Sequence, residues 1–176
     1  MLPPPQGIVT AVQQVCVVVR DLRRTIEEYV TRAGIGPWAV YTYAPPDLRN
    51  CRVRGREVPY SMRLALAWTN GFMWEVIEPL EGPSIYAEHL ETHGEGLHHV
   101  LVAHAGHDYA AALAELAKRG VPPLMEGHYK GTDFAYVDSE GPLKLVLELV
   151  KRPNHPGYRR PDPEYWYPFT PAVPFT

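Results

Sequence analysis

The stretch QQVCVVVRDL, residues 13–22, decides how the chain is interpreted, because a similar stretch, HHVLVAHAGH, returns at residues 98–107. Each copy opens with a run of apolar residues that is typical of a β-strand. In each copy an amphipathic, helix-like pattern follows and ends at a glycine, Gly34 or Gly120. An internal repeat on this scale indicates that the chain is built from two similar halves.

Strand-like runs complete the pattern in both halves, so each half has the order strand, helix, strand, strand, strand. We predict strands at 13–19, 38–43, 62–68, 72–80, 97–103, 123–129, 132–138 and 143–150, and repeat-related helices within 20–34 and 107–120.

A sheet with one helix-covered face must bury its other face against a second element. We therefore predict an α+β fold in which two βαβββ modules pair into a curved, cup-shaped mixed sheet with helices outside. The expected units are a first module at 10–80, a linker helix at 81–96, a second module at 97–151 and an aromatic and proline-rich tail at 152–176. The sequence leaves open whether the modules pair within one chain or between two.

The composition narrows the classes of partner. The chain has 176 residues and a net charge of −3, which gives no electrostatic reason to expect nucleic acid or a membrane surface as partner. No apolar run approaches the roughly 20 residues that span a bilayer, and no signal peptide pattern is present. With only two cysteines, Cys16 and Cys51, we expect a cytoplasmic protein without a disulfide framework.

Four polar residues stand at repeat-related positions of the predicted strands. Gln14 superposes on His99, and Glu75 superposes on Glu148. Both carboxylates lie within apolar runs, where a charge is costly unless it is paired or bound to a cation. If the halves are related by a pseudo-twofold axis, the four side chains converge on one point. Oxygen donors with one imidazole suit one divalent ion, such as Zn, Co, Ni, Mn or Fe.

Three segments resemble the vicinal oxygen chelate superfamily, which includes glyoxalase I, methylmalonyl-CoA epimerase, extradiol dioxygenases and bleomycin-resistance proteins. They are QVCVVVRDL (14–22), EVIEPLEGPSIYAEHLETHGEGLHHV (75–100) and LELV (147–150). The likeness is closest to the methylmalonyl-CoA epimerase branch and covers roughly residues 10–151. It implies the same ligands, Gln14, Glu75, His99 and Glu148. The first position is often His in the family, and the set found here is similar to that of zinc-type glyoxalase I.

The resemblance and the donor set predict a metal-dependent isomerase, epimerase or lyase that acts on a small molecule with a carbonyl group. In this hypothesis the ion stabilises an enolate formed when an adjacent C–H proton is removed. Glu148 is the expected catalytic base, and Glu75 is the second candidate. One alternative is a metal-free protein that binds or sequesters a small molecule. A less favoured alternative is an Fe(II) extradiol-type dioxygenase, because that chemistry normally uses two His ligands.

Other segments give further expectations. The tail is unsuited to helix or sheet because of its prolines, and its aromatic residues are expected to cover the cup or to form a homodimer interface. The basic loop 49–58 is interpreted as a solvated hairpin that could also meet phosphates. His98 should point away from His99, and His89 with His93 should be exposed rather than bind metal. The aromatic residues expected to bind substrate are Tyr158, Tyr165, Trp166 and Tyr167.

Overall fold

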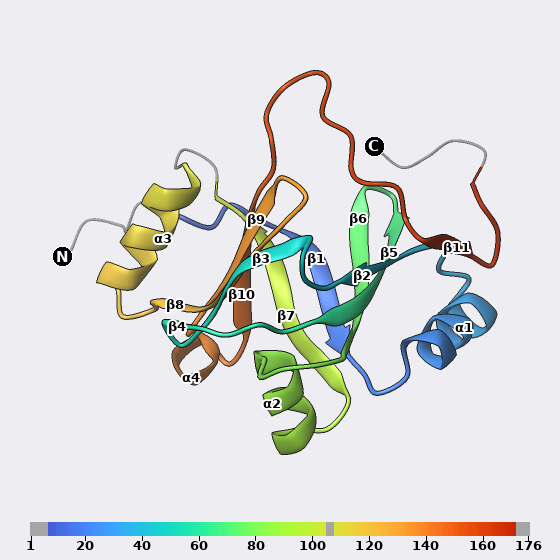
Figure 1. Cartoon of the computed structure of the whole chain (residues 1–176), viewed down its shortest axis with the longest axis horizontal. Coiled ribbons are helices and arrows are strands. Elements are labelled where there is room, and N and C mark those ends of the chain that lie inside the picture. Colours follow the sequence, from blue (N-terminus) through green and yellow to red (C-terminus); the bar gives the residue numbers. More distant parts are fainter. Residues whose placement is uncertain (1–6, 105–107, 172–176) are drawn as a thin grey trace.

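The computed structural model describes residues 7–104 and 108–171, which form one mixed sheet and four helices (Figure 1). The strands are β1 (Ala11–Val18), β2 (Trp38–Tyr43), β3 (Leu48–Val53), β4 (Arg56–Glu57), β5 (Met62–Thr69), β6 (Phe72–Pro79), β7 (Gly96–Ala103), β8 (Pro123–Tyr129), β9 (Thr132–Val137), β10 (Val146–Lys151) and β11 (Tyr165–Tyr167). The helices are α1 (Leu22–Ala33), α2 (Ile85–Thr92), α3 (Tyr109–Lys118) and α4 (Glu140–Leu143).

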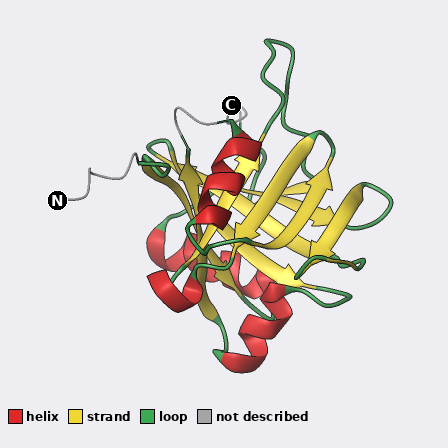
Figure 2. Cartoon of the chain, turned by 90° about the vertical axis from the view of Figure 1, so that its left-hand side faces the viewer, coloured by secondary structure: helices red, strands yellow, loops and turns green. Residues whose placement is uncertain are grey.

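The order of the strands confirms the predicted α+β cup. The sheet runs β11-β2-β5-β6-β1-β7-β10-β9-β8-β3-β4. Strands β1 and β7, which begin the two halves, pair antiparallel at its centre, and each pairs in parallel with the last strand of its own half, β6 or β10. The two halves therefore pair within one chain. The sheet curves, and helices pack on its outside (Figure 2).

The helix ends follow the signals in the sequence. Asp21 caps α1 by accepting a hydrogen bond from the Arg24 amide, and Gly34 ends the helix in the left-handed region at φ 66°. Ser84 caps α2 through the Ala87 amide. The predicted start of the second repeat helix at His107 falls outside the described residues. Within those residues, no helix is long and apolar enough to cross a membrane.

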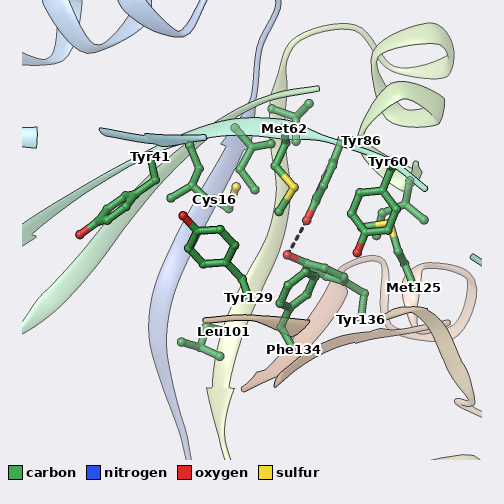
Figure 3. Packing of buried hydrophobic residues seen from close by; sticks show 14 of the residues in the cluster. Cys16, Tyr41, Tyr60, Met62, Tyr86, Leu101, Met125, Tyr129, Phe134 and Tyr136 are labelled. Atoms are coloured by element: carbon green, nitrogen blue, oxygen red, sulfur yellow. Dashed lines mark hydrogen bonds between the residues drawn. The ribbon is translucent and has the colours of Figure 1, made fainter. Parts of the chain in front are cut away.

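Alternation along the central strands separates an inner core from two outer cores. On β7, Leu101 belongs to the cluster inside the cup, whereas Val100 and Val102 pack with α3 outside it. The helix α1 covers the outer face of the first half in the same way, with Leu22 and Ile26 in the third cluster. The inner cluster is rich in aromatic and methionine side chains (Figure 3).

Two extensions connect the halves and correct the sequence-based interpretation. The basic loop is a hairpin as expected, but its strand β3 also pairs with β8 at the far edge of the second half. The tail, predicted to form neither helix nor sheet, contributes β11, which pairs with β2 of the first half. Its chain leaves β10, rises over one end of the molecule and returns to the opposite edge (Figure 1). Edge strands need few residues, so the intervening prolines do not prevent this pairing.

The last predicted strand also begins later than expected. Residues Glu140–Leu143 form a helical turn, and Lys144 ends it in the left-handed region at φ 61°. The strand therefore begins at Val146 rather than at residue 143.

Inside the cup, the hydroxyl groups of Tyr86 and Tyr136 form a buried hydrogen bond of 2.7 Å (Figure 3). Tyr86→Phe is expected to lower the free energy of unfolding by about 1–3 kcal/mol, because the Tyr136 hydroxyl loses its partner. Urea denaturation measures this change. The control Tyr165→Phe, at a 39% exposed residue, should stay within about 0.5 kcal/mol of the wild type. Equal effects of the two substitutions would contradict this account.

Candidate functional site

The structure brings the four predicted ligand side chains together at the floor of the cup. Gln14 Nε2 donates a hydrogen bond to Glu75 Oε2 at 2.5 Å. His99 Nε2 lies 3.1 Å from the same Glu75 oxygen and 3.5 Å from Glu148 Oε2. All four residues are buried. Their role as ligands remains a prediction, but their convergence is a property of the fold.

The register of the central strands explains this convergence. Gln14 pairs with Leu101, and His99 pairs with Cys16, as expected for two strands related by a twofold axis between them. The last strand of each half then adds its carboxylate one strand away: Glu75 pairs with Cys16, and Glu148 pairs with Leu101. The internal repeat therefore places two polar residues from each half around the same axis.

The cluster favours positive charge. Burial acts to lower the pKa of His99, but hydrogen bonds to Glu148 and Glu75 outweigh burial and raise its pKa to about 9. Two carboxylates with little access to water require a positive partner. A proton on His99 is one such partner. A divalent cation held by the same atoms is another, and it would replace that proton.

His98 lies beside the site, which corrects the expectation that it points to the opposite face. The register shifts between the Cys16–His99 pair and the Val17–Leu97 pair, so His98 is the extra residue of a β-bulge. Its Nδ1 lies 2.8 Å from His99 Nδ1. Burial and His99 lower the pKa of His98 to about 2. A neutral His98 can therefore accept a hydrogen bond from His99 Nδ1–H and orient the His99 ring, leaving His99 Nε2 for an ion.

Cys16 is a further neighbour that the sequence interpretation placed only in the core. One ligand atom from each of Cys16, Glu75 and His99 lies within 4.8 Å of the other two. Burial, followed by the charge of Glu75, raises the pKa of the Cys16 thiol well above its ordinary value. The thiol is therefore protonated, and only thiolate is a strong metal ligand. Its place on the same face as Gln14 was the available signal.

A pocket opens above this floor and reaches the tail. Its wall is largely apolar and aromatic, and includes Tyr43 and Tyr129, whose rings stack with centroids 3.6 Å apart. Arg152, Tyr158 and Arg160 also line the pocket, and sequence reasoning singled out only Tyr158 among these three. The cavity volume is about 40 Å³, which is space for a few water molecules. A larger ligand must therefore displace side chains or part of the tail.

The four aromatic residues predicted to bind substrate have different positions. Tyr158 lines the pocket, and its hydroxyl lies 3.1 Å from that of Thr132. Tyr165, Trp166 and Tyr167 form the edge strand β11 and are not among the pocket-lining residues. Tyr167 instead lies under the Arg23 guanidinium, 4.0 Å from it. Only Tyr158 of the predicted set is therefore placed to contact a ligand in this pocket.

The other charged and histidine groups lie apart from the floor. In the hairpin, Arg52 pairs with Glu57 at 3.1 Å, and Arg54 pairs with Glu88 of α2 at 2.5 Å. On α2, His93 is exposed and lies 3.7 Å from Glu140. His89, expected to be exposed, is half-buried and stacks on His93. These two histidines and Glu140 form a second group with metal-ligand spacing.

Comparisons with known proteins agree with this fold. The family model described as the Glyoxalase/Bleomycin resistance protein/Dioxygenase superfamily matches residues 13–136. No curated protein matches the chain in sequence.

Two epimerases are among the solved structures that resemble the chain. Methylmalonyl-CoA epimerase from Mycobacterium tuberculosis is 20% identical, with a TM-score of 0.59 over 87% of this chain and 93% of that chain. A variant of the Streptomyces coelicolor enzyme in complex with 2-nitronate-propionyl-CoA is 21% identical, with a TM-score of 0.58 over 83% and 96%. A hypothetical protein from Bacillus halodurans C-125 is 15% identical, with a TM-score of 0.59 over 82% and 96%. At these identities the likeness shows the fold.

The contact between His98 and His99 generates a test. If the four side chains hold a divalent ion, His98→Phe should weaken its binding by about 10- to 100-fold, because His99 loses the group that orients it. Phenylalanine suits the site, since the His98 ring already packs among Tyr86, Tyr136 and His89. Competition with a metal-sensitive dye measures the affinity. The control His155→Phe changes an exposed tail residue, and an equal loss there would refute the role of His98.

Proposed function

The chain belongs to the glyoxalase/bleomycin resistance/dioxygenase superfamily, and we propose that it is a metal-dependent isomerase, epimerase or lyase that acts on a small molecule with a carbonyl group. The observation that carries the proposal is the buried group formed by Gln14, Glu75, His99 and Glu148, of which all but His99 line a pocket. A structural core has no need for two buried carboxylates around one imidazole, because burying them is costly.

The donor set fits a divalent ion. His99 Nε2 faces the carboxylates of both Glu75 and Glu148. The Gln14 amide bonds Glu75 through its nitrogen, which leaves its oxygen as the atom that it would offer to an ion. One nitrogen and several oxygen donors suit Zn, Co, Ni, Mn or Fe. A bound ion would supply Lewis-acid stabilisation of the negative charge that develops on a substrate carbonyl oxygen.

Glu148 is better placed than Glu75 to accept a proton from the carbon beside that carbonyl. Glu75 is held by Gln14 at 2.5 Å and by His99 at 3.1 Å. Glu148 has a longer contact with His99, at 3.5 Å, and both carboxylates line the pocket. A less constrained carboxylate can turn toward a substrate and return with the proton. Proton return to the same or another carbon gives epimerisation or isomerisation, and loss of a neighbouring group gives elimination.

The wall of the pocket contributes by excluding water. Leu64, Leu66, Met73 and Phe134 surround the space above the carboxylates. Low polarity strengthens every electrostatic interaction at the floor and protects an anionic intermediate from stray protonation. The proposal also retains the expected cytoplasmic homodimer with a small molecule as ligand. The net charge of −3 supports the absence of nucleic acid or membrane partners.

The first test is the metal content of protein purified without added metal or chelator. Elemental mass spectrometry should find about one divalent ion per chain at the buried group, in line with a site of three or four protein ligands. The ion should be lost in the double variant His99→Ala/Glu148→Ala. Cys16→Ala and His93→Ala are the controls that should keep it, since they alter the neighbouring thiol and the exposed group on α2.

The outcomes separate the alternatives. Loss of the ion in His93→Ala alone would place the metal at α2 instead. No ion, and none taken up from Zn, Co, Ni, Mn or Fe, would leave a metal-free binding pocket and overturn the proposed reaction.

The second test isolates the base. Protein incubated in D₂O with a panel of carbonyl acids and thioesters should exchange an acidic C–H proton for deuterium, which NMR detects. Glu148→Gln should slow this exchange by about 10²- to 10⁴-fold, because the amide cannot accept the proton, while the side chain keeps an oxygen for the ion. Full exchange together with normal metal content in Glu148→Gln would exclude Glu148 as the base. Glu75→Gln is the matched comparison.

A further inference from the structure

Two arginines line the pocket above the buried carboxylates. Arg152 follows directly after β10, and Arg160 lies in the tail that crosses the end of the cup. Both are half-buried, and both share the pocket with Gln14 and Glu148. The family model ends at residue 136, so both arginines belong to a part of the chain beyond the matched region.

Within residues 7–104 and 108–171, neither guanidinium forms an ion pair with a carboxylate. Arg160 lies over the Trp68 ring, 5.3 Å from its centroid, and its Nη2 is 4.0 Å from the Met73 sulfur. Burial, followed by the charge of Arg160, lowers the pKa of Arg152, and the charge of Glu148 only partly offsets this. In contrast, Arg52 and Arg54 on the hairpin each have a glutamate within 3.1 Å. Two like charges therefore share a partly desolvated pocket, where a bound anion would reduce their mutual repulsion.

The space between the floor and these arginines defines the shape of a ligand. The floor offers the Glu75 and Glu148 carboxylates, and the middle offers the stacked Tyr43 and Tyr129 rings with Phe134. A molecule that enters the pocket by displacing side chains or part of the tail would have a carbonyl end, an apolar or aromatic body and an anionic end. Planar guanidinium groups match a carboxylate through two parallel hydrogen bonds.

We propose that Arg152 and Arg160 bind a carboxylate of the substrate, at the end away from the reacting carbonyl. The place of the carbonyl rests on the proposed function, whereas the carboxylate site depends only on the arginines and the pocket wall. The substrate class is therefore a carbonyl compound with an apolar body and a distal carboxylate. The tail contributes to specificity through Arg160, and the chemistry stays at the floor.

The first experiment tests the anion site without any metal. Chelator-treated protein is titrated with 3-phenylpropanoate and with the neutral 3-phenylpropanamide, and binding is followed by NMR. The carboxylate should bind on the order of 10- to 100-fold more tightly. Arg152→Met and Arg160→Met should each remove this preference while the amide binds as before. The control Arg159→Met removes the same charge from an exposed neighbour that donates a hydrogen bond to the Tyr158 carbonyl and is not among the pocket-lining residues, and it should keep the preference.

The second experiment joins the two ends of the pocket. Metal-loaded protein is titrated with ω-carboxyalkyl hydroxamates and their methyl esters, since a hydroxamate chelates divalent ions. The free acid should bind more tightly by a similar factor, and only in protein with both arginines. The carboxylate site would be overturned if the acid and the ester, or the propanoate and the amide, bound equally well. It would also be overturned if the preference for the carboxylate survived in both arginine variants. If phenylethylphosphonate bound about 10-fold more tightly than the propanoate, the arginines would be assigned to a phosphonate-like or phosphate-like anion, and the carboxylate assignment would be overturned.

The two experiments also separate this inference from the proposed function. A protein that holds no metal but still prefers propanoate over the amide keeps the carboxylate site and loses the metal-dependent reaction. A protein that holds metal and shows no such preference keeps the reaction and loses the carboxylate site.

Discussion

The central physical constraint on the structure is that two buried carboxylates, those of Glu75 and Glu148, must be compensated by the one imidazole of His99. Glu75 and Glu148 lie in central strands whose other buried side chains are apolar, where a lone negative charge would be strongly unfavourable. His99 lies on β7, next to the strand that carries Glu148, and its ring contacts both carboxylates. These contacts raise the pKa of His99. The same arrangement that tolerates a proton there is suited to a cation. The site is therefore a consequence of where the halves meet, because only that seam brings both last strands close to one histidine.

The pairing of β1 with β7, where the two halves meet, also explains why the first and last strands of each half carry the polar residues. Strands β1 and β7 pair antiparallel at the centre of the sheet, so any position on one has a symmetry mate on the other. A polar residue near the twofold axis of one half therefore has a counterpart near the axis in the other half. Each half supplies two polar side chains, and the four meet at the axis. The helices stay outside because the alternate residues of the same strands, such as Val100 and Val102, form the outer cores.

Much of this could be predicted from local patterns. Alternation and helix periodicity depend on neighbouring residues, so most element positions and the convergence of Gln14 with His99 followed from the repeat. The features that the sequence did not predict depend on contacts between segments that are distant in the chain. His98 turned toward the site because of a bulge that exists only in the pairing of β7 with β1. The strand β11 needed the free edge of β2. The two pocket arginines became visible only when the tail was placed over the pocket, since a sequence does not show which charges form ion pairs.

The central strands form the site, whereas the two extensions, the hairpin and the tail, lie at the edges of the sheet. The hairpin of the first half pairs with β8 of the second, and the tail after the second half pairs with β2 of the first. Each extension thus fastens one half to the far edge of the other, and the tail carries Arg160 to the pocket on its way. Changes in these segments can alter which molecule fits without disturbing the buried carboxylates, because the floor is built by central strands. In the proposed function, the reaction takes place on the central strands and substrate selectivity resides in the two extensions.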